Sequence, residues 1–500
     1  MIVNENSEIL KISEFYEPRF IRNLKLIRFR EALSQHPALE NVPLHHPGGL
    51  CIYPSPSFII LLIDQSFHTF STPVAFMTTK RFLSYLLVFL LGFGIYAICA
   101  GKTLFLQSSA PHYVYQAYSF LHGRIDLLQL PPSIHDLISF EGKWYVPGAP
   151  APAIIMMLPV AILGLKTSDI FFNVLLAAIN VVLIYDLLGL LASDPRLSHP
   201  ISESLRRWLT LFFALGTTHW YLGALGSVLF NAQLLAVACM ILFVRDTLTG
   251  ASSWRPGFWL GIAFMARPTT IFAITFYFFL VMLQNKNWKS LILRVLPTLC
   301  VLGVFVAVTF AHNFLRFHSP GNFGYEYAQG RPVLIEAYRQ FGGFNPVFIP
   351  CNLYVATIAI PFGVEIFPGV LNNLCAHLIS TQKPGAFPIE LLGSSMFLTM
   401  PPLFYLFRAR WRDPLVRAAL LACLSIFVPL LLYHNTGASQ FGYRYSLDMI
   451  VFLLILVASG IGEITARSRL IIIASIFINL TGFLLMFYYY YGYEWFKMWW

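Results

Sequence analysis

Long apolar stretches alternate with short polar links from Phe82 to the C-terminal region of the chain. Each stretch is continuously apolar, which is typical of membrane-spanning helices and not of the alternating strands of a membrane barrel. The pattern predicts an all-α, polytopic transmembrane helix bundle of about 11–12 spans, with short interfacial helices in its outer-face loops. The candidate spans are residues 82–100, 169–191, 208–223, 228–246, 256–266, 268–284, 293–314, 393–408, 415–433, 445–461 and 469–489.

Every second link in this series is basic. Because cytoplasmic loops of membrane proteins carry an excess of Lys and Arg, we predict that this set and the N-terminus are cytoplasmic. The long loops 101–168 and 317–390 then lie outside. The basic set comprises Lys80 and Arg81; Arg196, Arg206 and Arg207; Arg245 and Arg255; Lys286, Lys289 and Arg294; Arg408, Arg410, Arg412 and Arg417; Arg467 and Arg469.

Three shorter apolar stretches qualify this topology. Residues 151–165 contain two prolines and must not cross the membrane if the basic links are to stay on one side, so we predict a re-entrant or interfacial helix. Residues 256–266 and 268–284 are also short, and we predict two half-helices that meet at Arg267-Pro268. The loop 317–390 is too long for a simple connector, and we expect it to fold onto the membrane.

Residues 1–76 differ from the rest of the chain because they contain no apolar stretch of spanning length. We predict a poorly ordered N-terminal extension over 1–76, or sequence upstream of a start at Met77, before a transmembrane domain over 77–500. A small cytoplasmic helical module is the alternative, since residues 8–35 are rich in helix formers.

The composition agrees with a membrane protein, since 57% of the residues are hydrophobic and only 11% are charged. A soluble domain has about 25% charged residues. The net charge of +10 at pH 7 lies mostly in links beside the spans, where cations orient the protein and meet anionic lipid, so nucleic-acid binding is not predicted. No CxxC or DxD motif is present, so we predict no metal and no cofactor. Cys351 and Cys375 share one loop; we expect two unpaired thiols, with a disulfide as the alternative.

Two arginines on the predicted outer side are candidates for anion binding. Arg267 interrupts an apolar stretch, which is costly unless the charge is paired or solvated, and a guanidinium suits a phosphate. Its alternative role is snorkelling to the membrane surface. Arg444 lies between Tyr443 and Tyr445, where it is suited to hold a phosphate head; the alternative is an interfacial anchor with an Arg444–Asp448 pair.

Three further outer segments carry polar and aromatic residues. Residues 108–127 place aromatic residues at helical spacing and end in His-Gly-Arg-Ile-Asp; the alternative is an interfacial amphipathic helix. Residues 140–153 place Glu141 and Lys143 before a proline-rich entry into apolar sequence, which is also typical of a surface turn. Residues 312–330 resemble a substrate-facing loop. Hydrolase, nucleotide-binding and metalloprotease motifs are absent from the sequence.

Taken in order, these segments resemble the GT-C membrane glycosyltransferases, and most closely glycosyltransferase family 39, which includes protein mannosyltransferases and the lipid A aminoarabinose transferase. The resemblance covers about residues 80–490. It is carried by Tyr113 to Ala117 with Leu121 and Gly123, by Glu141 to Pro147, by Leu163-Gly164, by Gly261 to Pro268, and by Gly442, Arg444 and Tyr445.

The resemblance implies transfer of a sugar from a polyprenyl-phosphate donor to a lipid, glycan or protein acceptor on the outer side, with inversion. It further implies an integral protein of the bacterial plasma membrane that acts in the cell envelope. Arg267, Arg444 and Lys143 are the candidates for binding the donor phosphate. The candidates for lining the substrate site are Tyr113, Tyr443, Tyr445, Asn231 and His312, and Asn231 stands where relatives often carry a second acid.

The chain departs from the family at the expected catalytic acid, because residues 108–110 read Ser108, Ser109 and Ala110. Four nearby residues are therefore candidates for the general base. Asp126 is our first choice, since it closes the turn after the aromatic helix. The others are Asp136, Glu141 and His112. The alternatives to this function are a transporter or flippase of lipid-linked sugars and a non-catalytic GT-C homologue.

Overall fold

The computed structural model describes a helical membrane protein. The chain divides into Met1–Thr72 and Pro73–Trp500, and every described residue belongs to the second unit. The predicted extension over residues 1–76 lies outside the described residues, and so do Lys286 and most of 362–392. The described residues are 79–250, 252–285, 287–361, 374–375, 393–437 and 440–492.

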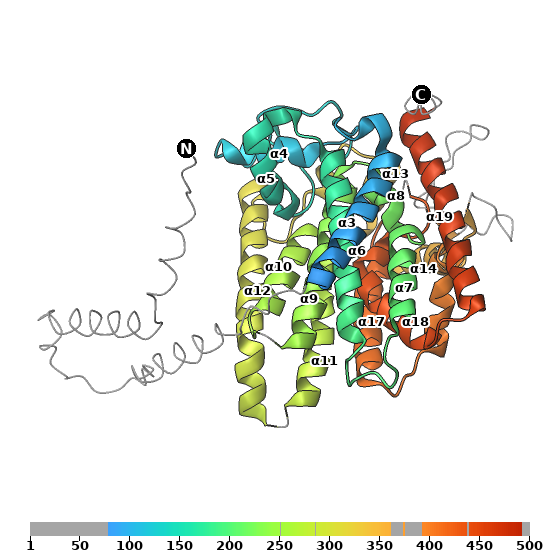
Figure 1. Ribbon diagram of the computed structural model, residues 1–500. Helices are drawn as coiled ribbons and strands as arrows, with labels where there is room; N and C mark the ends of the chain where they lie inside the picture. Colours follow the sequence, from blue (N-terminus) through green and yellow to red (C-terminus); the bar gives the residue numbers. More distant parts are fainter. Residues whose placement is uncertain are drawn as a thin grey trace, which may run out of the picture. The chain divides into compact units, whose positions relative to one another are not determined.

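Long apolar helices form the bundle, as the sequence pattern predicts (Figure 1). In the described part of the chain, seven helical segments are long and apolar enough to cross a membrane. Most of α9 is buried among its neighbours, whereas little of α3 and α12 is buried, so α9 is central and the other two lie at the periphery of the bundle. The segments are α3 (Thr79–Ala100, continuing to Thr103), α6 (Asp169–Leu191), α9 (Val228–Thr249), α12 (Trp288–Phe317), α17 (Pro414–Leu432), η11 with α18 (Arg444–Met449 and Ile450–Ile461) and α19 (Ala466–Tyr491).

The other four predicted spans consist of shorter helices, and three of the four are divided within the predicted span. Residues 208–223 divide into α7 (Glu203–Leu215) and α8 (His219–Ala224), and residues 393–408 into α16 (Met396–Thr399) and η10 (Pro401–Arg408). Hydropathy alone does not register such breaks, because the residues at them remain largely apolar.

The predicted pair of half-helices is present at Arg267-Pro268. Helix α10 (Arg255–Ala266) ends there, and η6 (Pro268–Ala273) leads into α11 (Ile274–Gln284). Arg267 has an extended backbone, with φ −142° and ψ 101°, because a residue that precedes proline is disfavoured in the helical region.

The segment 101–168 forms a small folded layer. It contains η4 (Gly101–Thr103), α4 (His112–Leu121), the paired strands β1 (Ile138–Phe140) and β2 (Lys143–Tyr145), α5 (Ala151–Leu163) and η5 (Gly164–Lys166). Figure 1 shows α4 and α5 at the upper end of the long helices, with the end of α11 at the lower end. Helix α5 has 13 residues, which span about 20 Å and fall short of a hydrocarbon core of about 30 Å.

The strand pair was not predicted from the sequence. Its turn is Glu141-Gly142, and both residues have positive φ, 50° and 74°. In this type of two-residue hairpin turn both central residues have positive φ, which favours glycine. The Glu-Gly pair was therefore the sequence signal that could have predicted the hairpin.

The segment after α12 is also built from short helices, namely η7 (Tyr325–Tyr327), α13 (Pro332–Phe341), η8 (Pro346–Phe348) and α14 (Ile349–Thr357). Cys351 of α14 forms a disulfide with Cys375. The expectation of two unpaired thiols was therefore wrong. Pairing depends on which segments meet in space, which cysteine spacing alone does not reveal.

Candidate functional site

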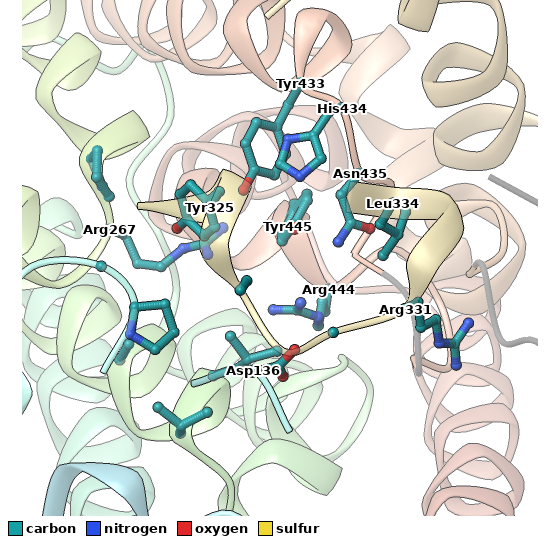
Figure 2. A pocket seen from close by; sticks show the side chains of 18 of the residues that line it. Asp136, Arg267, Tyr325, Arg331, Leu334, Tyr433, His434, Asn435, Arg444 and Tyr445 are labelled. Atoms are coloured by element: carbon teal, nitrogen blue, oxygen red, sulfur yellow. The ribbon is translucent and has the colours of Figure 1, made fainter. Parts of the chain in front are cut away.

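One cavity collects predicted site residues from four separate segments. Its volume is about 140 Å³ (Figure 2). Its walls come from α4, the residue before β1, the Pro147-Gly148 turn, the start of α9, the break after α10, the η7–α13 segment, the residues that follow α17, and η11. The predicted site residues that line it are Tyr113, Asp136, Arg267, Arg444 and Tyr445. These residues are separated by up to several hundred positions in sequence, so the fold brings them together.

Arg267 reaches the cavity because the backbone leaves the helix before Pro268. Its Nη2 donates to Oδ2 of Asp448 at 2.9 Å, and its Nε contacts the same carboxylate. Thr269 Oγ1 also donates to that carboxylate, at 2.9 Å. Asp448 is buried, so this ion pair is shielded from water. Among the residues that the structure describes, Nη1 of Arg267 has no hydrogen-bond partner.

Arg444 is held more rigidly, with 2% of its surface exposed. Its Nε donates to the carbonyl oxygen of Gly437 at 3.1 Å, and its Nη1 donates to Oε1 of Gln233 at 3.3 Å. Nη2 has no partner within the described ranges. The sequence alternative of an Arg444–Asp448 pair was wrong, because Asp448 bonds Arg267 instead. Gln233 connects the two arginines, since its Nε2 donates to Oδ1 of Asp448 at 3.2 Å.

The ring of Tyr445 lies close to the guanidinium groups of both Arg267 and Arg444. The guanidinium carbons of Arg267 and Arg444 lie 4.7 and 4.8 Å from the centroid of its ring. The two carbons are therefore less than 10 Å apart. Asp448 compensates one of the two positive charges, so the group keeps one net positive charge beside the cavity. Two donor nitrogens that have no partner among the described residues, set close to an aromatic ring, form a site suited to an anion.

Asp136 is the candidate base that lines the cavity. It has a positive φ of 67°, a conformation that Asp tolerates better than most residues. Its backbone N–H donates to the carbonyl oxygen of Gln329 at 2.8 Å, and the N–H of Gln329 donates to the carbonyl oxygen of Leu137 at 2.6 Å. These bonds fix the Asp136 backbone against the segment before α13.

The other candidate bases lie away from the cavity lining. Asp126 forms an ion pair with Arg124, and the hydrogen bond from Arg124 lowers the pKa of Asp126. Exposed Glu141 bonds exposed His318 at 3.2 Å. The fourth candidate, His112, is buried with its Nε2 placed 2.8 Å from the carbonyl oxygen of His135.

The remaining predicted residues also lie outside the lining. Lys143 is exposed on β2. The Asn231 side chain is buried and donates to Oδ1 of Asn173. His312 is buried with its ring edge-on to Phe120. The Tyr443 side chain is fully buried and does not line the cavity.

Sequence reasoning missed several residues that shape the cavity. Tyr325, Tyr433 and His434 line it, and none of the three was a candidate site residue. Tyr325 lies in the segment 312–330, which resembled a substrate-facing loop, and Tyr433 ends the predicted span 415–433. Gln233 could have been identified from the sequence, since it is a polar residue inside an apolar span, two positions after Asn231.

Arg316 was noted in the sequence only as part of the 312–330 segment, and the structure gives it a definite position. It is 1% exposed and donates to the carbonyl oxygens of Val146 at 2.8 Å and of Gly148 at 3.0 Å. It thereby holds the Pro147-Gly148 turn, which lines the cavity.

A buried carboxylate occupies the place where the family's acid was expected. Oδ2 of Asp169, at the start of α6, accepts a 2.6 Å hydrogen bond from Ser108 Oγ, and its Oδ1 accepts one of 2.8 Å from the Ser108 backbone N–H. Asp169 is fully buried and does not line the cavity. The carboxylate at Ser108 therefore comes from a different segment and fixes the loop to α6.

Comparisons with known proteins find distant likenesses only. The sequence matches no protein-family model, and no curated protein matches it. Among solved structures, the chain is similar to ArnT from Cupriavidus metallidurans bound to undecaprenyl phosphate, with 13% identity over 78% of this chain and a TM-score of 0.42. It is also similar to the Archaeoglobus fulgidus oligosaccharyltransferase, with 13% identity over 84% of this chain and a TM-score of 0.45.

The chain spans 62% and 57% of the lengths of these two structures. The oligosaccharyltransferase was also matched in a form tethered to an acceptor peptide, with a TM-score of 0.41. Both likenesses are distant, at 13% sequence identity.

Proposed function

We propose that this protein is a membrane glycosyltransferase that moves a sugar from a polyprenyl-phosphate donor to a lipid, glycan or protein acceptor on the outer side of the membrane. The observation that carries the proposal is the pair of arginines beside Tyr445. Each keeps a donor nitrogen that bonds none of the residues the structure describes, and both line one cavity with a carboxylate, Asp136.

The chemistry assigns a role to each charged group. The donor phosphate binds between Arg267 and Arg444, and both cations stabilise the charge that develops on the phosphate as it leaves. Asp136 accepts the proton of the acceptor hydroxyl. The bond between the anomeric carbon and the phosphate oxygen breaks, a bond from that carbon to the acceptor oxygen forms, and the proton resides on Asp136. The lipid phosphate leaves without needing a proton.

Two features support an outward-facing cavity. The basic links indicate a cytoplasmic N-terminus by the positive-inside rule. The Cys351–Cys375 disulfide lies in the segment expected outside, and disulfides persist in oxidising compartments such as the periplasm. The family resemblance favours the bacterial plasma membrane as the location.

One ionisable residue lies within a spanning helix and bears on the transporter alternative. It is Asp186 of α6, and transporters often place ionisable groups inside spans. Asp186 bonds Arg81 at 3.0 Å and Arg245 at 2.9 Å, both members of the basic set. This carboxylate is therefore part of an ion-pair network that joins α3, α6 and α9.

Binding of undecaprenyl phosphate to the purified protein tests the phosphate site. We expect Arg267→Gln and Arg444→Gln each to weaken binding about tenfold or more, since each removes a charge-assisted contact. Arg412→Gln is the matched control, because Arg412 is exposed in the basic link before α17. Unchanged binding in both cavity variants contradicts the proposal.

A further inference from the structure

The segment after α17 places a histidine in the cavity, enclosed by tyrosines. The ring centroid of His434 lies 4.4 Å from that of Tyr433, 5.1 Å from that of Tyr338 and 5.9 Å from that of Tyr325. Figure 2 shows His434 beside Tyr433. Its backbone N–H donates to the carbonyl oxygen of Gly343 at 3.0 Å, which fixes the residue against the end of α13. We call these four residues the aromatic cage.

The side chain of His434 is 6% exposed and makes no hydrogen bond to any described residue. Its Nδ1 is fully buried without a partner, and its Nε2 has none in the described part of the chain. Burial lowers the pKa of His434 to about 4, so the imidazole is neutral at physiological pH. A buried polar nitrogen without a partner is destabilising, and a ligand that bonds it removes that cost.

The cage lies next to the proposed phosphate site. Tyr433 contacts His434 on one side, and its ring centroid is 6.2 Å from that of Tyr445, the ring that the two arginines approach. The sugar of a polyprenyl-phosphate donor is joined directly to the phosphate. A donor phosphate beside Tyr445 therefore leaves its sugar within reach of Tyr433 and His434.

We propose that the aromatic cage binds the sugar of the donor, with His434 hydrogen-bonded to an uncharged sugar hydroxyl and the tyrosine rings packed against the sugar's C–H faces. The cage contains no carboxylate, ammonium or guanidinium group, so it suits a hydroxyl in preference to a charged substituent at that position. This inference rests on the proposed function, and it makes His434 a residue that determines donor specificity.

The test compares a bare lipid phosphate with lipids that carry a sugar. The probes are undecaprenyl phosphate and undecaprenyl phosphates bearing glucose, mannose or arabinose, titrated against purified full-length protein. His434→Phe keeps an aromatic ring without hydrogen-bonding nitrogens, and His434→Gln keeps a donor and an acceptor. His122→Gln is the matched control, because His122 is exposed and outside the cavity.

We expect His434→Phe to bind the preferred sugar-bearing lipid about 5- to 10-fold more weakly than the unaltered protein, the usual effect of one lost hydrogen bond between uncharged groups. Binding of undecaprenyl phosphate should be unchanged. His434→Gln should recover part of the loss, and His122→Gln should match the unaltered protein for every probe.

Three results would overturn the inference. The first is an equal loss for bare and sugar-bearing lipids in both His434 variants, which assigns His434 a structural role. The second is unchanged binding of every sugar-bearing lipid in both variants. The third is an unaltered protein that binds no sugar-bearing lipid more tightly than undecaprenyl phosphate. Failure of the proposed function gives a different result, since Arg444→Gln then keeps full affinity for undecaprenyl phosphate.

Discussion

Replacing Arg444 by lysine separates the charge of this residue from its geometry. The guanidinium uses Nε on Gly437 and Nη1 on Gln233, which leaves Nη2 for a ligand. A lysine ammonium is a single point donor on a flexible chain and cannot make all three contacts from that position. Arg444→Lys therefore keeps the positive charge but loses either the protein contacts or the phosphate contact.

The size of the effect follows from the lost contact. A hydrogen bond to a charged group contributes about 1.5–3 kcal/mol, so losing the one to phosphate lowers kcat/KM about 10- to 150-fold. Leaving Oε1 of Gln233 unsatisfied in a buried position lowers the free energy of unfolding by a further amount of about 1 kcal/mol or more. The loss of activity should thus exceed what the loss of stability explains.

The assay is transfer of a radiolabelled sugar from an undecaprenyl-phosphate donor to membrane acceptors, with thermal unfolding measured on the same preparations. Arg412→Lys is the control, because Arg412 is exposed and lies outside the cavity. If Arg444→Lys transfers sugar with the kcat/KM of the unaltered protein, the several donor nitrogens of the guanidinium are not required and the reasoning is refuted.

Three other predictions follow from the geometry. Asp136→Asn should lower kcat about 100-fold or more without changing undecaprenyl phosphate binding, whereas Asp126→Asn should keep its turnover; a fully active Asp136→Asn excludes that base. Gly257→Ala should lower the melting temperature, since a Cβ there would lie 2.1 Å from a backbone oxygen of α12, at a cost of about 1–3 kcal/mol; Gly303→Ala, with open space, is the control. Val347→Cys should react with a membrane-impermeant maleimide from outside only, and labelling from the cytoplasmic side alone disproves the topology.

The two arginines were predictable from sequence because their environment is unusual. A guanidinium inside or beside an apolar span costs free energy unless its charge is paired, solvated or bound to a ligand. Arg267 and Arg444 are therefore conspicuous in the sequence. The break at Pro268 was predictable for a similar local reason, since proline disfavours helix in the residue before it. Signals of this kind depend only on neighbours in sequence.

The choice between Asp126 and Asp136 depended on contacts between residues that are distant in sequence. Asp126 follows the aromatic helix, which made it the first choice, but its carboxylate pairs with Arg124 two residues away. Asp136 lines the cavity because its backbone bonds Gln329, almost 200 positions later. His434 and Tyr325 could not be predicted for the same reason, since they meet through packing between distant loops and belong to no distinctive motif.

The buried carboxylate of Asp448 has a consequence for turnover. A sugar joined to a polyprenyl phosphate makes a phosphodiester with one negative charge, whereas the product lipid phosphate is a monoester whose second pKa is about 6. The product therefore carries more negative charge than the substrate at neutral pH. Two uncompensated arginines would hold that product tightly and slow its departure, and departure of product often limits an enzyme's rate. In the proposed reaction, the pairing of Asp448 with Arg267 at 2.9 Å lowers the positive charge of the site and would favour escape of the spent carrier.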